Sequence, residues 1–280
     1  HSSAASDVYK RQEFYKRAIT VVALVSILTL LFSYGSNSSL EIAIYLITLL
    51  SFHEWLSISS KSKFYIVPFF VLLYLIDYNK WIDIGLFSIF ILLLLAIMMY
   101  LTFNHESYLR EKIRKYSLFY GVIINSSFFL FLINLYPYDN TLGTQSYLLD
   151  NKHYFIILIS LVSFIDMSAY LSGKLIGKNK ITSAISPNKT YEGYIGALVL
   201  TILSFIIISN YFNFQWTLSD IILLLIFIIM VFFGDFMMSL IKRVFEIKDT
   251  GSLLPGHGGI LDRLDGYFTS LPIFYLWFLF

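Results

Sequence analysis

The sequence predicts an all-α, polytopic integral membrane protein with about nine transmembrane helices and a cytoplasmic N-terminus. Only 14% of the 280 residues are charged, whereas soluble globular proteins average about 25%. Hydrophobic residues make up 58% of the chain, and the mean hydropathy is +0.73. The apolar residues gather into segments of the length that crosses a bilayer. The absence of cysteine excludes disulfides and thiolate metal sites.

The predicted spans follow from the positions of these apolar segments along the chain. They cover residues 18–34, 39–57, 64–77, 81–102, 116–136, 153–171, 194–213, 218–238 and 267–280. A tail at 1–17 precedes them, and its first part, 1–12, is interpreted as a sequence-start artefact because it has neither an initiator Met nor an apolar core. We therefore divide the chain into N-terminal helices at 18–136 and a motif-bearing region at 153–280, with cytoplasmic loops at 172–193 and 239–266.

The distribution of basic residues sets the predicted orientation. Lys and Arg accumulate on the cytoplasmic side of membrane proteins. With the N-terminus inside and the spans alternating, only Lys80 and Lys152 of the 20 basic residues fall outside. A missed or invented span would invert every later loop, so this asymmetry supports both the span count and the orientation.

Five carboxylates lie in or at the ends of the predicted spans. Ionisable residues are costly inside a membrane, so each is a candidate for function. Glu41 and Asp220 fall near the outer face, where we expect them to reach interfacial water. Glu54 lies near an inner end, and both interpretations, a functional role and contact with interfacial water, stay open for it. Asp166 and Asp235 lie about a turn or two inside the cytoplasmic end, next to the polar loops, and a functional role is favoured for both.

The stretch from 235 onward has polar residues at helical spacing. If the eighth span continues as a helix into the cytoplasm, Asp235, Ser239, Lys242 and Glu246 share one face. Snorkelling at the membrane surface would explain Lys242. It does not explain Asp235, which needs a cation or another partner at that depth.

The stretch 251–266, GSLLPGHGGILDRLDG, combines glycines with a close pair of aspartates. On a helix, Asp262 and Asp265 would have Cβ atoms about 5–6 Å apart, so their charges repel unless a cation sits between them. Carboxylate oxygens are ligands of Mg²⁺, whose shell phosphate substrates complete. The glycines free backbone N–H groups to contact an anion. A surface Asp/Arg motif is the alternative interpretation of the aspartates, and an ordinary flexible turn is the alternative for the glycines. A flexible turn leaves the nearby carboxylates, His257 and Arg263 unexplained.

A second polar stretch, 186–193, has the sequence SPNKTYEG. Ser186 before Pro187 predicts an N-cap and the first residue of the helix that carries the seventh span. A helix N-terminus attracts anions, and Lys189 in the first turn would strengthen that attraction. A plain start to the span is an equally good interpretation of Ser186 and Pro187.

The preceding stretch, GKLIGKNK at 173–180, resembles a phosphate-binding loop but is predicted not to be one. No Ser or Thr follows Lys178, and no strand precedes the stretch. Gly173 and Gly177 lie at i, i+4 and indicate close helix packing.

The other motifs supply carboxylates for a metal, and amides and cations for phosphates. Together they predict a metal-assisted phosphate site at the cytoplasmic membrane surface.

These motifs resemble the signature of the phosphatidate cytidylyltransferases, also called CDP-diacylglycerol synthases. The resemblance lies in SLIKRVFEIKDTGSLLPGHGGILDRLD at 239–265, and SPNKTYEG and DMSAY (166–170) are similar to further motifs of the family, in the expected order. The N-terminal spans match only in character. The residues at the fixed positions of the signature are Ser239, Lys242, Arg243, Lys248, Asp249, Gly251, Pro255, His257, Gly258, Gly259, Asp262, Arg263 and Asp265.

The resemblance implies that CTP and phosphatidic acid give CDP-diacylglycerol and pyrophosphate, with Mg²⁺ as cofactor and two cations in the site. It makes 153–280 the catalytic region. The catalytic residues that it implies are Asp235, Asp262, Asp265, Lys242 and Arg263. The implied metal ligands are Asp235, Asp262, Asp265 and Asp249. The implied substrate-binding residues are Ser186, Lys189, Arg243, Lys248, His257, Gly258, Gly259 and Asp166, with His257 ordering the loop or donating a hydrogen bond rather than acting as a base.

Two alternatives stay open at this point. A CTP-dependent polyprenol or dolichol kinase would transfer the γ-phosphate to a neutral lipid alcohol and would need a base near that hydroxyl. An ion-coupled transporter often shows internal repeats, but the sequence shows none and its polar residues gather at one face. The expected setting is a bacterial inner (cytoplasmic) membrane with the site facing the cytoplasm. The expected partners are CTP, phosphatidic acid and the lipid bilayer, with no nucleic acid and with a homodimer left open.

Overall fold

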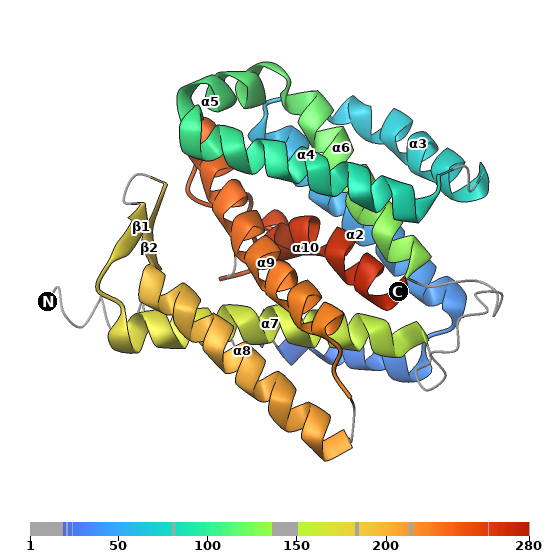
Figure 1. Ribbon diagram of the computed structural model, residues 1–280. Helices are drawn as coiled ribbons and strands as arrows, with labels where there is room; N and C mark the ends of the chain where they lie inside the picture. The colour runs from blue at the N-terminus through green and yellow to red at the C-terminus, as the bar shows by residue number, and fades with distance from the viewer. Residues whose placement is uncertain are drawn as a thin grey trace, which may run out of the picture.

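The computed structural model describes residues 19–279 except 21, 24, 80–81, 136–150, 183–184, 213–214 and 257. Within these residues the chain is mainly helical and has one two-stranded sheet (Figure 1). An apolar helix at Val25–Tyr34 precedes the labelled elements. In chain order these are α2 (Asn37–Ile58), the 3₁₀-helix η1 (Lys63–Tyr65), α3 (Ile66–Asn79), α4 (Ile84–Asn104), α5 (Glu106–Lys115), α6 (Ser117–Asn134), α7 (Asn151–Ile176), β1 (Lys180–Thr182), β2 (Ser186–Thr190), α8 (Tyr191–Phe212), α9 (Leu218–Val244) and α10 (Leu261–Leu279).

Within the described residues, six helices are long and apolar enough to cross a membrane, judged by length and composition. They cover Ser38–Ile58, Ile84–Asn104, Ser117–Asn134, His153–Ile176, Tyr191–Tyr211 and Leu218–Val244. In α4, only 11% of the apolar window is buried within the protein, as expected of a helix that is apolar all round and faces lipid. A helical membrane protein is therefore confirmed in outline, whereas the nine spans and the cytoplasmic N-terminus stay predictions.

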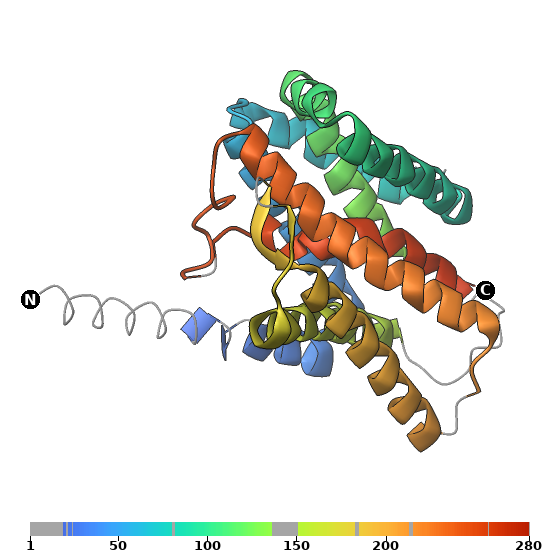
Figure 2. The ribbon, with the colours of Figure 1, turned by 60° about the vertical axis from the view of Figure 1, so that its left-hand side comes forward.

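Helices α9 and α10 lie side by side, as both ribbon views show (Figure 1 and Figure 2). Gly234 of α9 permits this approach, because a Cβ atom there would collide with the main-chain oxygen of Asp265 on α10. Apolar side chains gain little by leaving lipid for protein, so close packing at small residues favours helix association in a bilayer. The contact brings Asp235 and Asp265 to neighbouring positions.

Helix α2 is fixed to α6 by polar contacts within the core. The indole Nε1 of Trp55 donates a hydrogen bond to the main-chain oxygen of Ser117 at 2.8 Å, and Ser51 Oγ donates to Asn125 Oδ1 at 2.5 Å. A Cβ atom at Gly121 would collide with the Trp55 ring, so the small residue lets the indole lie against α6. These buried contacts hold the part of α2 that faces the start of α10.

Helix α5 lies between the predicted spans 81–102 and 116–136, where no helix was predicted. Its Leu109 and Ile113 are each 1% exposed, and their i, i+4 spacing places both on one face. Arg114 donates a hydrogen bond to the main-chain oxygen of Val244, the last residue of α9, at 2.8 Å. The helix therefore packs its apolar face on α9 and satisfies an end carbonyl that α9 leaves without a partner in its own helix.

Two details of helix α9 and of the stretch before α8 differ from the predictions. Helix α9 ends at Val244, and Glu246 has a φ of 58° and pairs with Arg114 at 3.1 Å. The predicted polar stripe therefore stops at Lys242, because the left-handed residue turns the chain away from the helix axis. The predicted N-cap at Ser186 is also wrong, since residues 186–190 form strand β2.

Strand β2 pairs with β1 in antiparallel fashion, with Lys180 opposite Thr190. This pairing occupies backbone groups that a helix starting at Pro187 would need, and Pro at a strand position fits an extended φ. Helix α8 begins at Tyr191, and Thr190 caps it by accepting a hydrogen bond from the N–H of Gly193 at 3.2 Å.

The close packing predicted for Gly173 is confirmed. A Cβ atom there would lie 3.7 Å from the Cα of Gly193 and 3.2 Å from Thr190 Oγ1, so α7 and α8 meet at small residues. Within 173–180, the stretch predicted to be no phosphate loop, two backbone N–H groups have a partner. The backbone N–H groups of Lys178 and Asn179 already donate to the carboxylate of Glu192.

Candidate functional site

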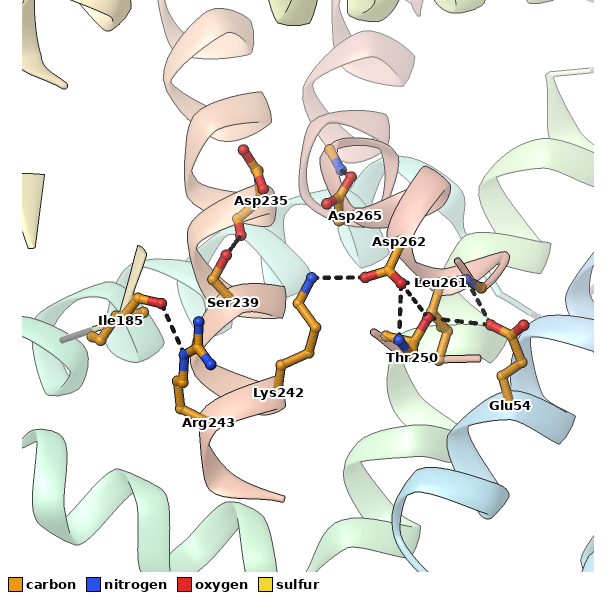
Figure 3. Close-up of polar contacts among 12 residues, drawn as sticks. Glu54, Ile185, Asp235, Ser239, Lys242, Arg243, Thr250, Leu261, Asp262 and Asp265 are labelled. Carbon is orange, nitrogen blue, oxygen red and sulfur yellow. Dashed lines mark hydrogen bonds and ion pairs between the residues drawn. The ribbon is translucent and has the colours of Figure 1, made fainter. Parts of the chain in front are cut away.

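An ion pair joins α9 to the start of α10. The Nζ of Lys242 donates to Oδ1 of Asp262 at 2.7 Å, and the two side chains are 20% and 11% exposed (Figure 3). Lys242 lies in the last turn of α9, and Asp262 lies in the first turn of α10. Each charge favours its helix end, since cations stabilise C-termini and anions stabilise N-termini.

The second oxygen of Asp262 accepts hydrogen bonds from the loop that leads into α10. Oδ2 accepts hydrogen bonds from the N–H and the hydroxyl of Thr250, both at 2.9 Å, and from the N–H of Gly259 at 3.3 Å. Burial raises the pKa of the Asp262 carboxyl, but the hydrogen bonds from Lys242 and Thr250 outweigh burial and hold this pKa below its ordinary value. Asp262 is therefore ionised at neutral pH, and both of its oxygens have partners.

A second ion pair joins α9 to strand β2. Lys189 Nζ contacts Oδ2 of Asp235, and the two side chains are 17% and 35% exposed. The hydroxyl of Ser239 donates to the main-chain oxygen of Asp235 at 2.9 Å, one turn along the same helix. The structure therefore gives Asp235 a partner, a lysine from the hairpin.

Two further carboxylates, Asp166 on α7 and Asp265 on α10, lie near Asp235. The three are close enough to repel one another electrostatically, and Lys189 attracts both Asp166 and Asp265. Oδ1 of Asp265 accepts a hydrogen bond from the adjacent N–H of Gly266 at 2.9 Å. Figure 3 shows Asp235 and Asp265 on neighbouring turns of α9 and α10, above Lys242. Three helices thus bring carboxylates to one place beside a lysine.

The other predicted site residues are spread around this centre. Nε of Arg243 donates to the main-chain oxygen of Ile185 at 3.2 Å, which ties α9 to the hairpin, and the side chain is exposed. Arg263 is exposed and interacts electrostatically with Asp166. Ser186 is buried, at 8% exposed.

The remaining predicted residues belong to the loop between α9 and α10. Lys248 and Asp249 are exposed, and no ion pair of either is found within the described part of the chain. Gly258 has a φ of 81°, which favours glycine, and Gly259 donates to Asp262. His257 lies outside the described residues.

The predicted metal ligands are not gathered as one group. Among the described residues, no group of three or more His, Asp or Glu residues is arranged to hold a metal ion. Asp262 pairs with Lys242, whereas Asp235 and Asp265 lie with Asp166 in the other cluster. The Mg²⁺ site therefore stays a prediction.

Sequence reasoning gave no role to Tyr194 and Thr250, and left Glu54 open. The hydroxyl of Tyr194 is buried, has no hydrogen-bond partner among the described residues, and interacts electrostatically with Asp166, Asp235 and Asp265. Its ring stacks on Phe232 with centroids 4.0 Å apart. The signal for Tyr194 in the sequence is its position one helical turn after Thr190, which belongs to the motif at 186–193. Thr250 lies inside the 239–265 motif, between two of its fixed positions.

The comparisons with known proteins agree with these motifs. A family model described as the cytidylyltransferase family matches residues 15–280. Relatives named phosphatidate cytidylyltransferase are 42% identical in Staphylococcus haemolyticus, 40% in Staphylococcus saprophyticus and 39% in Staphylococcus aureus, each over 127 residues. The matched segment is 44% of this chain and 48% of each relative, so the match spans about half the length of these proteins.

Proposed function

The chain belongs to the cytidylyltransferase family, and we propose that it transfers the cytidylyl group of CTP to phosphatidic acid, giving CDP-diacylglycerol and pyrophosphate. The observation that carries this proposal is a pair of lysines in the same region of the protein, each held by an ion pair with an aspartate. Lys189 of β2 pairs with Asp235, and Lys242 of α9 pairs with Asp262. Cations fixed in this way suit two substrates that both bring phosphate groups. The names of the matched relatives support the same reaction.

The reaction needs little help from a general base. A phosphomonoester has a second pKa of about 6, so phosphatidic acid carries a nucleophilic dianion near neutral pH. One of its phosphate oxygens forms a bond to the α-phosphorus of CTP. The bond from that phosphorus to the bridging oxygen of the β-phosphate breaks, and pyrophosphate leaves with the electron pair. The main barrier is repulsion between two anions, which fixed positive charge lowers.

The basic residues of the site would supply this charge. Lys242 is oriented by Asp262, which is itself locked by three hydrogen bonds from the loop. The hydrogen bonds to Asp262 therefore hold Lys242 in place before the substrate arrives, so little reorganisation is needed during the reaction. Arg243 and Arg263 are exposed nearby, where they would contact phosphates of CTP or of the lipid.

Mg²⁺ belongs to the proposal as the cofactor, with two cations in the site. Asp166, Asp235 and Asp265 carry the oxygen donors that Mg²⁺ prefers and repel one another, although among the described residues they are not arranged as a group of three metal ligands. Bound Mg²⁺ would offset the negative charge of the reacting phosphates. Asp262 would join the ligands only by giving up Lys242, because both of its oxygens already accept hydrogen bonds.

The membrane placement is part of the same proposal. The N-terminus and the loop between α9 and α10 would face the cytoplasm of a bacterial inner membrane, where CTP is soluble. The exposed apolar faces of the helices would contact lipid. The acyl chains of phosphatidic acid would stay in the bilayer while its phosphate reaches Lys189 and Lys242 at the membrane surface.

The fate of the two ends of CTP tests the proposed reaction. Purified protein receives phosphatidic acid and CTP that carries one label in the cytosine and another on the γ-phosphate. We expect the cytosine label in the lipid phase and the γ-label in soluble pyrophosphate. A lipid that carries the γ-label, with cytosine left in soluble CDP, would indicate a lipid kinase and contradict the proposal.

A further inference from the structure

Glu54 is a buried carboxylate that the proposed reaction does not use. It lies on α2, in the N-terminal part of the chain, and is 3% exposed. Its neighbours Phe52, Trp55 and Leu56 are also buried, and Trp55 fixes this turn of α2 to α6. Glu54 therefore sits on a rigid support, with its carboxylate directed toward the start of α10 (Figure 3).

The carboxylate of Glu54 contacts the start of α10 and a residue within the loop between α9 and α10. Oε2 accepts a hydrogen bond from the N–H of Leu261, the first residue of α10, at 3.0 Å. The same oxygen lies 3.4 Å from the hydroxyl of Thr250, inside the loop. That hydroxyl also lies 2.9 Å from Oδ2 of Asp262. Thr250 thus stands between Glu54 and the carboxylate that orients Lys242.

Two glycines of the loop lie directly against Glu54. A Cβ atom at Gly251 would lie 2.6 Å from Oε1 of Glu54, and one at Gly259 would collide with Oε2. The loop backbone therefore approaches this carboxylate more closely than any residue with a side chain would allow. These positions explain two glycines of the motif by their fit to a residue of α2, far away in the sequence.

The other oxygen of Glu54 has no hydrogen-bond partner among the described residues, although it is buried. Burying an unsatisfied carboxylate oxygen lowers stability. An apolar residue at this position would avoid that loss but would leave the N–H of Leu261 without the acceptor that Oε2 provides. The contacts with Leu261 and the loop therefore account for a glutamate here.

We propose that Glu54 is a positioning residue that holds the α9–α10 loop at Thr250 and the start of α10 against α2 and, through Thr250, fixes Asp262 and Lys242 for phosphate binding. This inference rests on the proposed function for its link to catalysis. It assigns a role to an N-terminal helix, which carries none of the recognised motifs. Glu54 itself touches neither substrate nor metal in this account.

Glu54→Ala and Glu54→Gln separate positioning from a general packing role. Alanine removes both contacts with the loop, whereas glutamine keeps an oxygen that can accept from the N–H of Leu261. We expect kcat to fall about 10- to 100-fold in Glu54→Ala, as for other residues that support a site from behind. Glu54→Gln should restore part of that loss. Glu41→Gln, on the same helix and far from the loop, should keep the wild-type kcat.

A spectroscopic measurement tests the loop without relying on activity. Because the chain has no cysteine, a single Cys at the exposed Ser252 can carry a nitroxide spin label. Its mobility should rise in Glu54→Ala and rise less in Glu54→Gln, while a label at the exposed Leu218, at the far end of α9, should be unchanged. Equal mobility at position 252 with and without Glu54 would overturn the proposal, whether or not the protein transfers cytidylyl groups.

Thr250→Val gives a second test if Glu54→Ala does not fold. Valine keeps the shape of threonine but removes the hydroxyl between Glu54 and Asp262. We expect a more mobile label at position 252 and a lower kcat. Wild-type values for both would overturn the proposal. If the label becomes mobile in a protein that proves to be inactive with phosphatidic acid, the positioning of the loop stands and the proposed function fails.

Discussion

Replacing Lys242 by methionine would leave Oδ1 of Asp262 without its cation. The side chains of the pair are only 20% and 11% exposed, so water would replace the lost contact poorly. At 2.7 Å the Coulomb attraction is about 6 kcal/mol for an effective dielectric constant of about 20, and desolvation of the two charges offsets much of it. Breaking a buried pair costs about 3–5 kcal/mol, and the partial exposure lowers our expectation to about 2–4 kcal/mol in the free energy of unfolding.

A double-mutant cycle measures this coupling. The wild type, Lys242→Met, Asp262→Asn and the double variant are unfolded by denaturant in the same detergent. The double variant leaves no unpaired charge, so its loss should be smaller than the sum of the single losses by about 2 kcal/mol or more. Arg110→Met serves as a matched control, since it breaks a more exposed pair, with Glu106 one turn away on the same helix, and should cost less than about 1 kcal/mol. Losses for Lys242 and Asp262 that add to within about 0.5 kcal/mol would refute the reasoning.

Three further predictions concern the site and its orientation. Tyr194→Phe removes a buried hydroxyl that has no partner among the described residues and lies near the three carboxylates, so the unfolding temperature should hold or rise. If this hydroxyl contacts the reacting groups, kcat should fall about 10-fold or more, and a wild-type kcat would exclude such a contact. Asp262→Asn should lower turnover by about 100-fold, whereas Asp220→Asn, at the N-terminal end of α9, should not, and equal rates would exclude Asp262 from the site. A Cys at Ser252 should react with an impermeant thiol reagent only after the membrane is opened, and labelling of intact cells would contradict the cytoplasmic loop.

Composition predicted the helical membrane class, because the length and polarity of apolar segments are local properties. It did not predict helix α5, since the apolar residues Leu109 and Ile113 stand alone in a charged stretch and become visible only when they pack on α9. The strand at 186–190 was missed for a related reason. Ser186 and Pro187 form a local N-cap pattern, but pairing with residues 180–182 decides the structure.

The motifs predicted which residues form the site but not how they pair. Asp262 and Asp265 are neighbours in sequence, yet Asp262 turns to Lys242 while Asp265 joins Asp166. Spacing on one helix could not show this, because the choice depends on helices that meet only in the folded chain. Glu54 is the extreme case, since 207 residues separate it from its hydrogen-bond partner Leu261. Sequence reasoning could mark it as a costly carboxylate but could not supply its partner.

The central claim is that the phosphate of phosphatidic acid attacks the α-phosphorus of CTP. The most direct test uses phosphatidic acid that carries oxygen-18 in its phosphate, with unlabelled CTP and purified protein. Mass spectrometry of the products should then find all of the oxygen-18 in CDP-diacylglycerol and none in pyrophosphate. Oxygen-18 in the pyrophosphate, or a lipid product without cytidine, would contradict the claim.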